Sequence, residues 1–520
     1  MNKFFISGAL VIIIFLLYNF ILAFGSLEGT PQKLTGNLPF PYLTEKPLTE
    51  DGYYMLTVAW NIAEGNGFTY NYGVRTTGVQ PLATMLYSVP AYLVQNFGGD
   101  KYDFARAIII FSALLQIIFA FLVFRLAVSI SKDPDRGLYF LVSVCVMLFN
   151  FKVLLNFANG LETGLYLILL SLFFLYWIKF NEIQPGLKQS LGLGLLSGLL
   201  LLCRLDSVVI LFTFYILLFF TGRIKFRQLA VILLVAFLLY LPWQLYIWDV
   251  TGSILQSSAR SQTGLFPFFD LASKLEQYFA SIIQHFTPFL YTGNLLTWLM
   301  FLLGLPYIIF LFVVFSKKYQ RYFSNDSKNI LIPIAISFSV LVIVYFFFST
   351  ATHFYFRYTA YLMVFSFPVI VVLFSRLLKK LFYSKVLMVF LVVLAIFGIQ
   401  AFLYLHSGKA ARVLTERLEF VKNNFSADER IAALQTGILG YFYQNVFNLD
   451  GKMDNFALMS MNTNQVSNYL DSLEINVLME WKDFIPQLLD KDYLEKEWEL
   501  YSDDIGDGRT MCYVRKNTRF

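Results

Sequence analysis

Charged residues are scarce in this chain of 520 residues. Asp, Glu, Lys and Arg together make up 14% of it, whereas a soluble domain carries roughly 25%. This shortage excludes a protein whose whole surface faces water. Hydrophobic residues make up 58% of the chain and aromatic residues 18%. Apolar runs of about 20 residues, each long enough to cross a bilayer, recur from the N-terminus to about residue 405.

Cysteine and histidine are also rare, with three of each. Cys145 and Cys203 lie in or near apolar runs and Cys512 is alone in a polar tail, so we expect no disulfide framework. Without a close Cys/His cluster, a zinc site is not expected. The net charge of +6 does not indicate nucleic acid, because Lys and Arg lie between apolar runs, where membrane topology explains them. We find no internal repeat and no low-complexity segment.

The apolar runs predict about eleven transmembrane spans. The first follows Lys3 and is longer than the roughly 7–15-residue apolar core of a signal peptide, so we expect it to be retained. The predicted spans are 4–24, 104–130, 138–154, 162–180, 189–203, 207–222, 228–248, 294–316, 329–349, 358–376 and 386–405.

The positions of the cations predict the orientation of these spans. With Lys3 in the cytoplasm, every cytoplasmic loop carries Lys or Arg, and the short outer loops carry almost none. The cytoplasmic cations would be Lys132, Arg136, Lys179, Lys188, Arg223, Lys225, Arg227, Lys317, Lys318, Arg321, Arg376, Lys379, Lys380 and Lys385. We therefore expect a multi-pass protein of the plasma (inner) membrane, with a cytoplasmic N-terminus and an exoplasmic, periplasmic tail.

Residues 25–103 form the first exoplasmic loop in this topology. The apolar stretch 79–97 is not counted as a span, because it would invert the cations of every later loop. Its Pro81, Pro90 and polar ends suggest a helix that lies at the membrane interface. The stretch 53–64 has the same character, with Asp51 as a possible start and Gly65 and Gly67 as its end. We therefore predict two interfacial helices in this loop.

The tail from residue 407 is charged, and helix-like and strand-like patterns alternate along it. Helices are predicted at 411–424, 464–473 and 484–490, and strands at 430–434, 446–449, 475–481 and 510–515. The predicted fold class is mainly α. Residues 1–406 form a polytopic transmembrane helical bundle that includes the two interfacial helices, and residues 407–520 form a small C-terminal α/β exoplasmic domain.

Two carboxylates of the outer side are candidate catalytic groups. Asp51 or Glu50 could take a proton from an attacking hydroxyl, although Asp51 is also a preferred residue for a helix N-cap. Glu162 could face the same outer cavity and hold a sugar, a metal ion or the acceptor. It also stands three residues after Asn159, which is the spacing of a capping box. The two interpretations of Glu162 are compatible.

Further ionisable residues fall at the outer ends of spans, where a charge is costly unless it is hydrated or paired. Arg204 could bind phosphate through its planar fork or simply pair with Asp206. His353, Arg357 and Tyr358 could bind the phosphate of a lipid donor. The alternative for Arg357 is that its charged end simply extends to the membrane interface. Arg75 lies in a turn, 65–81, whose glycine, aromatic and polar residues suit either sugar binding or an ordinary surface loop.

Taken together and in this order, these motifs resemble the GT-C superfamily of membrane glycosyltransferases. The likeness is greatest to the branch that includes the terminal arabinofuranosyltransferases of mycobacterial cell walls. The shared motifs are Asp51-Gly-Tyr-Tyr, residues 61–71, residues 77–82, Gly160-Leu-Glu-Thr, Arg204-Leu-Asp, Arg357-Tyr, residues 437–441 and Asn448-Leu-Asp-Gly. They extend over nearly the whole chain.

The resemblance implies a polyprenyl-phosphate sugar donor and inversion at the anomeric carbon. Asp51 would be the general base, with Glu50 as the fallback, and Glu162 matches the second acidic position. Arg204 and Arg357 match positions near the donor phosphate, although Leu205 stands where relatives often carry proline. A divalent metal is used by some members of the superfamily and not by others. The acceptor would be a cell-envelope glycan, a lipid or a protein.

Other functions of a polytopic protein have to be weighed against the enzyme. A transporter or lipid flippase would also have a cavity, but transporters usually show internal repeats and ionisable residues near the middle of the membrane. A catalytically inactive scaffold with an exoplasmic binding domain is a third possibility, against which the acidic residues argue. The sequence leaves open which sugar is transferred and to which acceptor.

Overall fold

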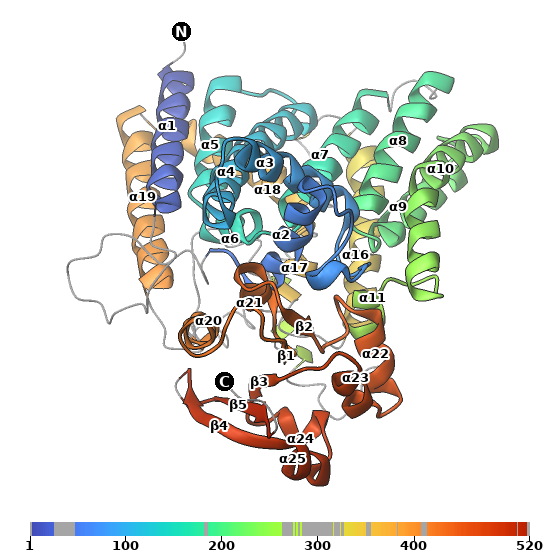
Figure 1. The fold of residues 1–520 in the computed structure, drawn as a ribbon. Coiled ribbons are helices and arrows are strands. Elements are labelled where there is room, and N and C mark those ends of the chain that lie inside the picture. Colours follow the sequence, from blue (N-terminus) through green and yellow to red (C-terminus); the bar gives the residue numbers. More distant parts are fainter. Residues whose placement is uncertain are drawn as a thin grey trace.

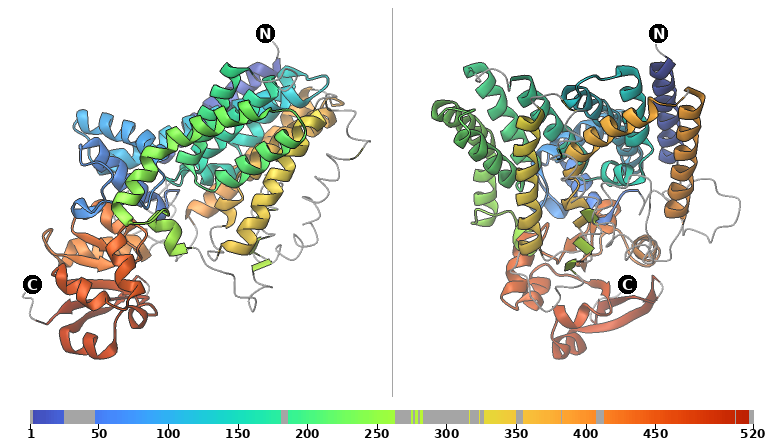
Figure 2. Two further views of the ribbon diagram at one scale, coloured as in Figure 1. Left: turned by 90° about the vertical axis from the view of Figure 1, so that its right-hand side faces the viewer. Right: turned by 180° about the vertical axis from the view of Figure 1, so that it is seen from behind.

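The computed structural model of the protein describes residues 3–24, 47–180, 186–262, 327–349, 355–381, 383–406, 413–506 and 508–516, with short pieces between 274 and 323. A layer of long helices forms one part, and a smaller part containing a β-sheet lies at one end of this layer (Figure 1). The N-terminus lies at the opposite end, and the two further views in Figure 2 show the same arrangement.

Four helices of the described part are long and apolar enough to cross a membrane. These are α1 (Lys3–Ala23), α4 (Lys101–Ile130), α10 (Phe226–Thr251) and residues 331–348 of α16 (Ser327–Phe348). Shorter helices of the same apolar character are α7 (Thr163–Phe180), α8 (Leu187–Cys203), α9 (Ser207–Phe220), α18 (Leu362–Leu378) and α19 (Tyr383–His406). Apolar side chains such as Leu234 and Phe237 of α10 point outward. The chain is an integral membrane protein.

Each of these nine helices overlaps a predicted span. The predicted span 294–316 lies, apart from its last residue, outside the described residues, so the total of about eleven spans stays a prediction. The predicted span 138–154 contains a break. Helix α5 (Arg136–Leu148) ends within it, and α6 (Phe151–Ala158) continues at an angle of 67°. The break lies at Asn150, whose side-chain oxygen accepts hydrogen bonds from Lys152 N and Val153 N and so starts a new helix.

Two helices do occur in the first loop, at α2 (Glu50–Ala63) and α3 (Pro81–Asn96). Helix α2 starts earlier than expected, because Thr49 and not Asp51 is its N-cap: Thr49 Oγ1 accepts a hydrogen bond from Gly52 N at 3.2 Å. Helix α3 starts at Pro81, where the missing amide hydrogen costs nothing. Between them lie the 3₁₀ turn Asn71–Gly73 and Gly65 and Gly67, whose positive φ angles suit glycine.

The smaller part contains a five-stranded sheet in the order β2-β1-β3-β5-β4. Strand β1 pairs in parallel with β2 and β3, while β5 pairs antiparallel with β3 and β4. Its elements are α20 (Val413–Asn424), β1 (Ile431–Ala433), α21 (Gly437–Phe442), β2 (Val446–Asn448), α22 (Asn455–Asn462), α23 (Val466–Ser472), β3 (Val477–Trp481), α24 (Ile485–Leu488), α25 (Lys491–Glu497), β4 (Trp498–Ile505) and β5 (Thr510–Arg515). The predicted strands are all present. Strand β4 was not predicted, because most of its side chains are exposed and it lacks an apolar pattern.

Alternate residues of the strands pack on opposite faces of this sheet, as the two-residue period of a strand requires. On one face, Leu478 of β3 belongs to a core with Val466 and Leu470 of α23. On the other face, Val477 and Met479 join the core that includes Leu418 and Val421 of α20 and extends into the helical layer. Apolar contacts therefore connect the sheet to the membrane part of the chain.

A buried ion pair crosses this second face. Arg417 of α20 lies 3.4 Å from Glu480 of β3, and both side chains are almost completely buried. Arg417 also donates to Thr510 Oγ1 at 2.9 Å. The other oxygen of Glu480 accepts a hydrogen bond from the backbone of Leu434 at 2.7 Å. Glu480 therefore fixes both helix α20 and the segment that follows β1.

We predict that Glu480→Ala destabilises this part of the protein, because breaking a buried ion pair from one side costs about 3–5 kcal/mol. Hydrogen exchange at the β1 and β3 amides of the purified protein measures that loss. Glu495→Ala is the matched control: its ion pair with Lys491 is exposed and should contribute less than about 1 kcal/mol. Equal exchange in the two variants would contradict the assigned role of Glu480.

Candidate active site

The first turn of α2 lies against the turn that carries Glu162. Gly52 makes this approach possible, because a Cβ atom there would lie 2.0 Å from the backbone oxygen of Asn159. Gly160 has a φ of 80°, and a Cβ atom there would lie 3.1 Å from the Cα atom of Gly52. Thr49 adds two hydrogen bonds, from its N and Oγ1, to the same Asn159 oxygen. The acidic start of α2 is thereby held beside Glu162.

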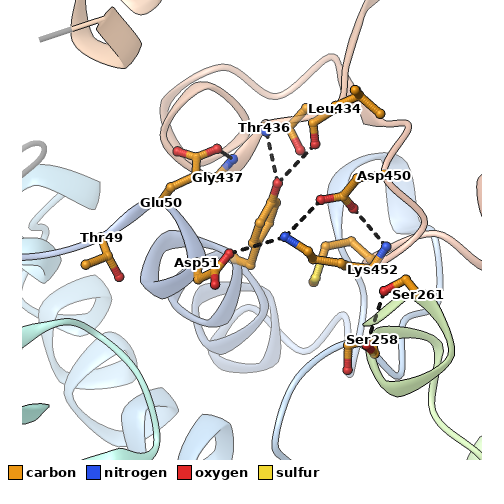
Figure 3. A network of polar contacts seen from close by, with 12 residues as sticks. Thr49, Glu50, Asp51, Ser258, Ser261, Leu434, Thr436, Gly437, Asp450 and Lys452 are labelled. Carbon is orange, nitrogen blue, oxygen red and sulfur yellow. Dashed lines mark hydrogen bonds and ion pairs between the residues drawn. The ribbon is translucent and has the colours of Figure 1, made fainter. Parts of the chain in front are cut away.

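Glu50 and Asp51 point in different directions from α2 (Figure 3). The carboxylate of Glu50 accepts hydrogen bonds from Gly437 N and, at 2.9 Å, from Ile438 N at the start of α21. A Cβ atom on Gly437 would lie 2.0 Å from the Glu50 backbone oxygen, so glycine is required for this contact. Burial raises the pKa of Glu50 to about 7, although its two backbone hydrogen bonds oppose that rise. Glu50 therefore anchors α2 to the smaller part.

Arg204 is the centre of a buried polar network. Its guanidinium is 6% exposed and lies 3.0 Å from Glu162 and 2.6 Å from Asp206. It also donates to the hydroxyl of Tyr345 on α16 at 2.9 Å. The ring of Tyr345 stacks on that of Tyr358, with centroids 4.9 Å apart. This network joins the ends of α7, α8, α9 and α16.

Two helices in this region start without the side-chain caps that their sequences could provide. The capping box of Asn159 and Glu162 does not form, because α7 starts at Thr163 and the Asn159 side chain accepts from Leu161 N instead. Asp206 precedes α9 but makes no capping hydrogen bond. Both carboxylates turn toward Arg204, because a buried guanidinium without partners would cost more than an uncapped helix end.

Two further cations flank Asp51. Arg357 Nη1 lies 3.7 Å from one oxygen of its carboxylate, and Lys452 Nζ lies 3.6 Å from the other. Arg357 also lies 3.5 Å from Glu162, and Lys452 lies 3.3 Å from Asp450. Burial lowers the pKa of Lys452, but the carboxylates of Asp450 and Asp51 outweigh it and raise that pKa. Figure 3 shows Lys452 between the two carboxylates.

Several of these residues line a cavity of about 540 Å³. Its charged lining residues are Asp51, Arg204, Asp206, Arg357 and Lys452. Its apolar lining comes mainly from α9 and α16, with Val208, Val209, Leu341, Val344 and Phe348. The cavity is thus suited to a molecule with an anionic or polar end and an apolar end.

Some predicted site residues lie elsewhere. Arg75 pairs with Asp249, and both side chains are more than half exposed. It lies over the ring of Tyr246 and does not line the cavity. His353 lies outside the described residues. Among the described residues, no group of three or more His, Cys, Asp or Glu is arranged to hold a metal ion.

Three residues of the site were missed from the sequence. Tyr345 was inside a predicted span, where a tyrosine gives no signal of its own. Asp450 belongs to the motif Asn448-Leu-Asp-Gly, and Lys452 directly follows that motif. An acidic residue and a lysine around a glycine turn were the signal that could have found them.

No protein-family model matches the sequence, and neither does any curated protein. The fold, however, is similar to that of solved structures. ArnT from Cupriavidus metallidurans in the apo state aligns over 97% of this chain and 97% of its own, with a TM-score of 0.51 and 11% identity. This chain shares the fold of ArnT, which is the GT-C fold.

Two further GT-C structures are also similar. ArnT from Cupriavidus metallidurans bound to undecaprenyl phosphate aligns over 98% of each chain, with a TM-score of 0.50 and 11% identity. The arabinofuranosyltransferase AftD from mycobacteria aligns over 98% of this chain and 40% of its own, with 12% identity and a TM-score of 0.44. The predicted GT-C fold class, mainly helical with a small C-terminal sheet, is confirmed.

The raised pKa of Glu50 predicts a pH dependence of stability. The unfolded chain loses this proton near its ordinary pKa of 4.5, whereas the folded protein keeps it to about 7. The folded state therefore binds more protons between these values, and its stability falls as the pH rises through them. Thermal unfolding in detergent should show this fall in the wild type and a smaller fall in Glu50→Gln. The control Glu474→Gln, on an exposed side chain, should follow the wild type. Parallel curves for wild type and Glu50→Gln would contradict the assignment.

Proposed function

We propose that this protein is a membrane glycosyltransferase with a polyprenyl-phosphate sugar as donor. The acceptor is a hydroxyl of a cell-envelope glycan, lipid or protein, and the anomeric carbon is inverted. The observation that carries this proposal is the cavity itself, whose lining combines the carboxylates of Asp51 and Asp206 with three cations and a set of apolar side chains. The GT-C fold, which ArnT bound to undecaprenyl phosphate shares, supports the same function.

Such a donor has a charged end and an apolar chain, and these match the charged and the apolar residues that line the cavity. The polyprenyl chain would lie along the apolar residues of α9 and α16, beside the bilayer. The phosphate would lie near the arginines, whose planar fork suits its oxygens. Arg204 is held on three sides by Asp206, Glu162 and Tyr345. Arg357 makes longer contacts to Asp51 and Glu162 and is therefore better placed to turn toward a phosphate.

In the proposed reaction, the acceptor oxygen attacks the anomeric carbon while Asp51 takes its proton. The bond from this carbon to the phosphate oxygen breaks, and its electron pair stays on the polyprenyl phosphate. Attack from the face opposite the leaving phosphate inverts the configuration. Arg204 and Arg357 stabilise the charge that develops on the phosphate, an effect that is often the largest in catalysis. Glu162, which is fully buried, holds both arginines in place.

Asp51 and Glu50 are adjacent, but their contacts differ, and this difference favours Asp51 as the general base. Asp51 lines the cavity, whereas the carboxylate of Glu50 is taken up by the backbone of residues 437 and 438. We predict that Asp51→Asn lowers sugar transfer by about 100-fold or more, the contribution expected of a general base. Glu50→Gln should lower transfer less than Asp51→Asn does, because it keeps one oxygen for the amides of residues 437 and 438 and leaves the lining of the cavity unchanged.

Purified protein would be incubated with a panel of polyprenyl-phosphate sugars and candidate glycan acceptors, and mass spectrometry would follow the product. Donor binding should survive in Asp51→Asn, because only the proton acceptor is removed. Transfer that survives in Asp51→Asn but is lost in Glu50→Gln would move the base to Glu50. No transfer from any donor to any acceptor would count against the proposed function.

The orientation in the membrane is also part of this proposal. The cytoplasmic N-terminus and the exoplasmic active site and C-terminal part, residues 407–520, follow from the distribution of Lys and Arg. The position of the N-terminus at the far end of the helical layer from the sheet supports it (Figure 1). No nucleotide is then needed at the active site, since the polyprenyl phosphate carries the sugar.

Single cysteines test this orientation, because the three native cysteines are buried. We predict that a membrane-impermeant maleimide labels Asp503→Cys, in the exposed part of β4, in intact spheroplasts. The matched variant Lys132→Cys, in the exposed turn after α4, should be labelled only after the membrane is permeabilised. The reverse pattern would place the active site in the cytoplasm.

A further inference from the structure

Lys452 is a cation of the cavity that comes from the C-terminal part of the chain and not from the membrane helices. It lines the cavity with Asp51 and Arg357, and its side chain is 24% exposed. The two cations approach the two oxygens of the Asp51 carboxylate, at 3.6 and 3.7 Å. At these distances both cations interact electrostatically with Asp51. Neither is hydrogen-bonded to it, because the distances exceed that of a hydrogen bond.

The turn that carries Lys452 is built to hold it there. Lys452 N donates to Asp450 Oδ1 at 2.8 Å, and Gly451 adopts a φ of 73° that suits glycine. The amide of Asn448 donates to the hydroxyl of Tyr54 on α2 at 3.2 Å. Tyr54 lies one turn of helix after Asp51. Asp51 and Tyr54 therefore lie on the same face of α2, and the turn that carries Lys452 packs against this face.

The first loop holds this turn from the other side. A Cβ atom on Gly78 would lie 2.0 Å from the backbone oxygen of Lys452 and 3.0 Å from the sulfur of Met453. The backbones of residues 78 and 452 are thus in direct contact, which only glycine at position 78 allows. The backbone of Lys452 is thereby fixed, and its side chain forms ion pairs with Asp51 and Asp450.

We propose that Lys452 binds the phosphate of the polyprenyl donor, so that the C-terminal part completes the active site. The inference rests on the proposed function. Arg204 directs most of its N–H groups at Asp206, Glu162 and Tyr345. The phosphate is therefore met by Arg357 from the membrane part and by Lys452 from the C-terminal part, on either side of Asp51.

This arrangement links donor binding to the base. When the phosphate binds Lys452 and Arg357, it shares their charges with Asp51 and with their other partners, Asp450 and Glu162. The carboxylate is then available to accept the proton of the acceptor hydroxyl. As the bond between sugar and phosphate breaks, the electron pair goes to the phosphate oxygen that faces these two cations. Lys452 thus acts on the leaving group and Asp51 on the nucleophile.

The test is binding of three probes to the purified full-length protein in detergent: undecaprenyl phosphate, undecaprenol and inorganic phosphate. Lys452→Gln should weaken the binding of undecaprenyl phosphate by about 10- to 100-fold, the loss expected for a charged hydrogen bond. Binding of undecaprenol, which lacks the phosphate, should not change. Lys452→Arg should restore much of the affinity, and the control Lys496→Gln, on an exposed side chain, should bind like the wild type.

A second measurement uses the wild type alone and does not depend on the folding of a variant. Undecaprenyl phosphate should protect Lys452 from an amine-acylating reagent, as read by peptide mass spectrometry. Undecaprenol should not protect it, and protection by inorganic phosphate alone would show a site for the free anion and not for the lipid. If the wild type binds undecaprenyl phosphate but Lys452 is neither protected nor needed, the proposal is overturned and the proposed function stands. If the wild type does not bind it, both are overturned.

Discussion

The docking of helix α2 on residues 434–453 is the contact on which the rest of the site depends. Tyr54 accepts a hydrogen bond from Thr436 N at 3.0 Å and one from the Asn448 amide. Glu50 is bound by the start of α21. With α2 held in this orientation, the side chain of Asp51 points into the cavity. The charges of the site are placed by this contact and not by local helix preferences, which would have used Asp51 as a cap.

The ionic groups of the cavity are arranged by the high cost of leaving any one of them unpaired near a membrane. Arg204, Glu162 and Asp206 are largely buried, and Arg204 makes short contacts with both carboxylates. Arg357 and Lys452 are more exposed and lie farther from their carboxylates. A rigid inner layer therefore supports an outer layer that is able to rearrange around a ligand. Such support from behind is what a catalytic constellation requires if its geometry is to be reproducible.

Much of this arrangement could be predicted from the sequence. Apolar runs predicted the long helices, and alternating patterns predicted β1, β2, β3 and β5. Asp51, Glu162, Arg204, Asp206 and Arg357 were all singled out. Four of them line one cavity, whereas Glu162 does not line it but is buried against Arg204 and Arg357. They were recognisable because a charge at the end of an apolar run is costly and so indicates a partner or a ligand.

Other features depend on contacts between distant parts of the chain and could not be predicted locally. Starting α2 at Thr49 fixes which way Glu50 and Asp51 point, and neighbouring residues of a helix differ by about 100° around its axis. The choice between them is decided by Gly437, nearly 400 residues later along the chain. Lys452 was missed for the same reason, since its partner Asp51 lies in the first loop. The break at Asn150 was missed because one polar residue within an apolar run does not by itself end a span.

The placement of Asp51 and Lys452 at opposite ends of the chain has a consequence for biosynthesis. About 400 residues must be made between them, which takes roughly 20–80 s at ordinary rates of translation. During this interval the helices enter the membrane one after another. The contact between α2 and residues 434–453 cannot yet form. The nascent protein therefore carries Asp51 in its first loop well before Lys452 is made. Under the proposed function, the site cannot hold its donor from both parts of the chain until residues 434–453 have been synthesised.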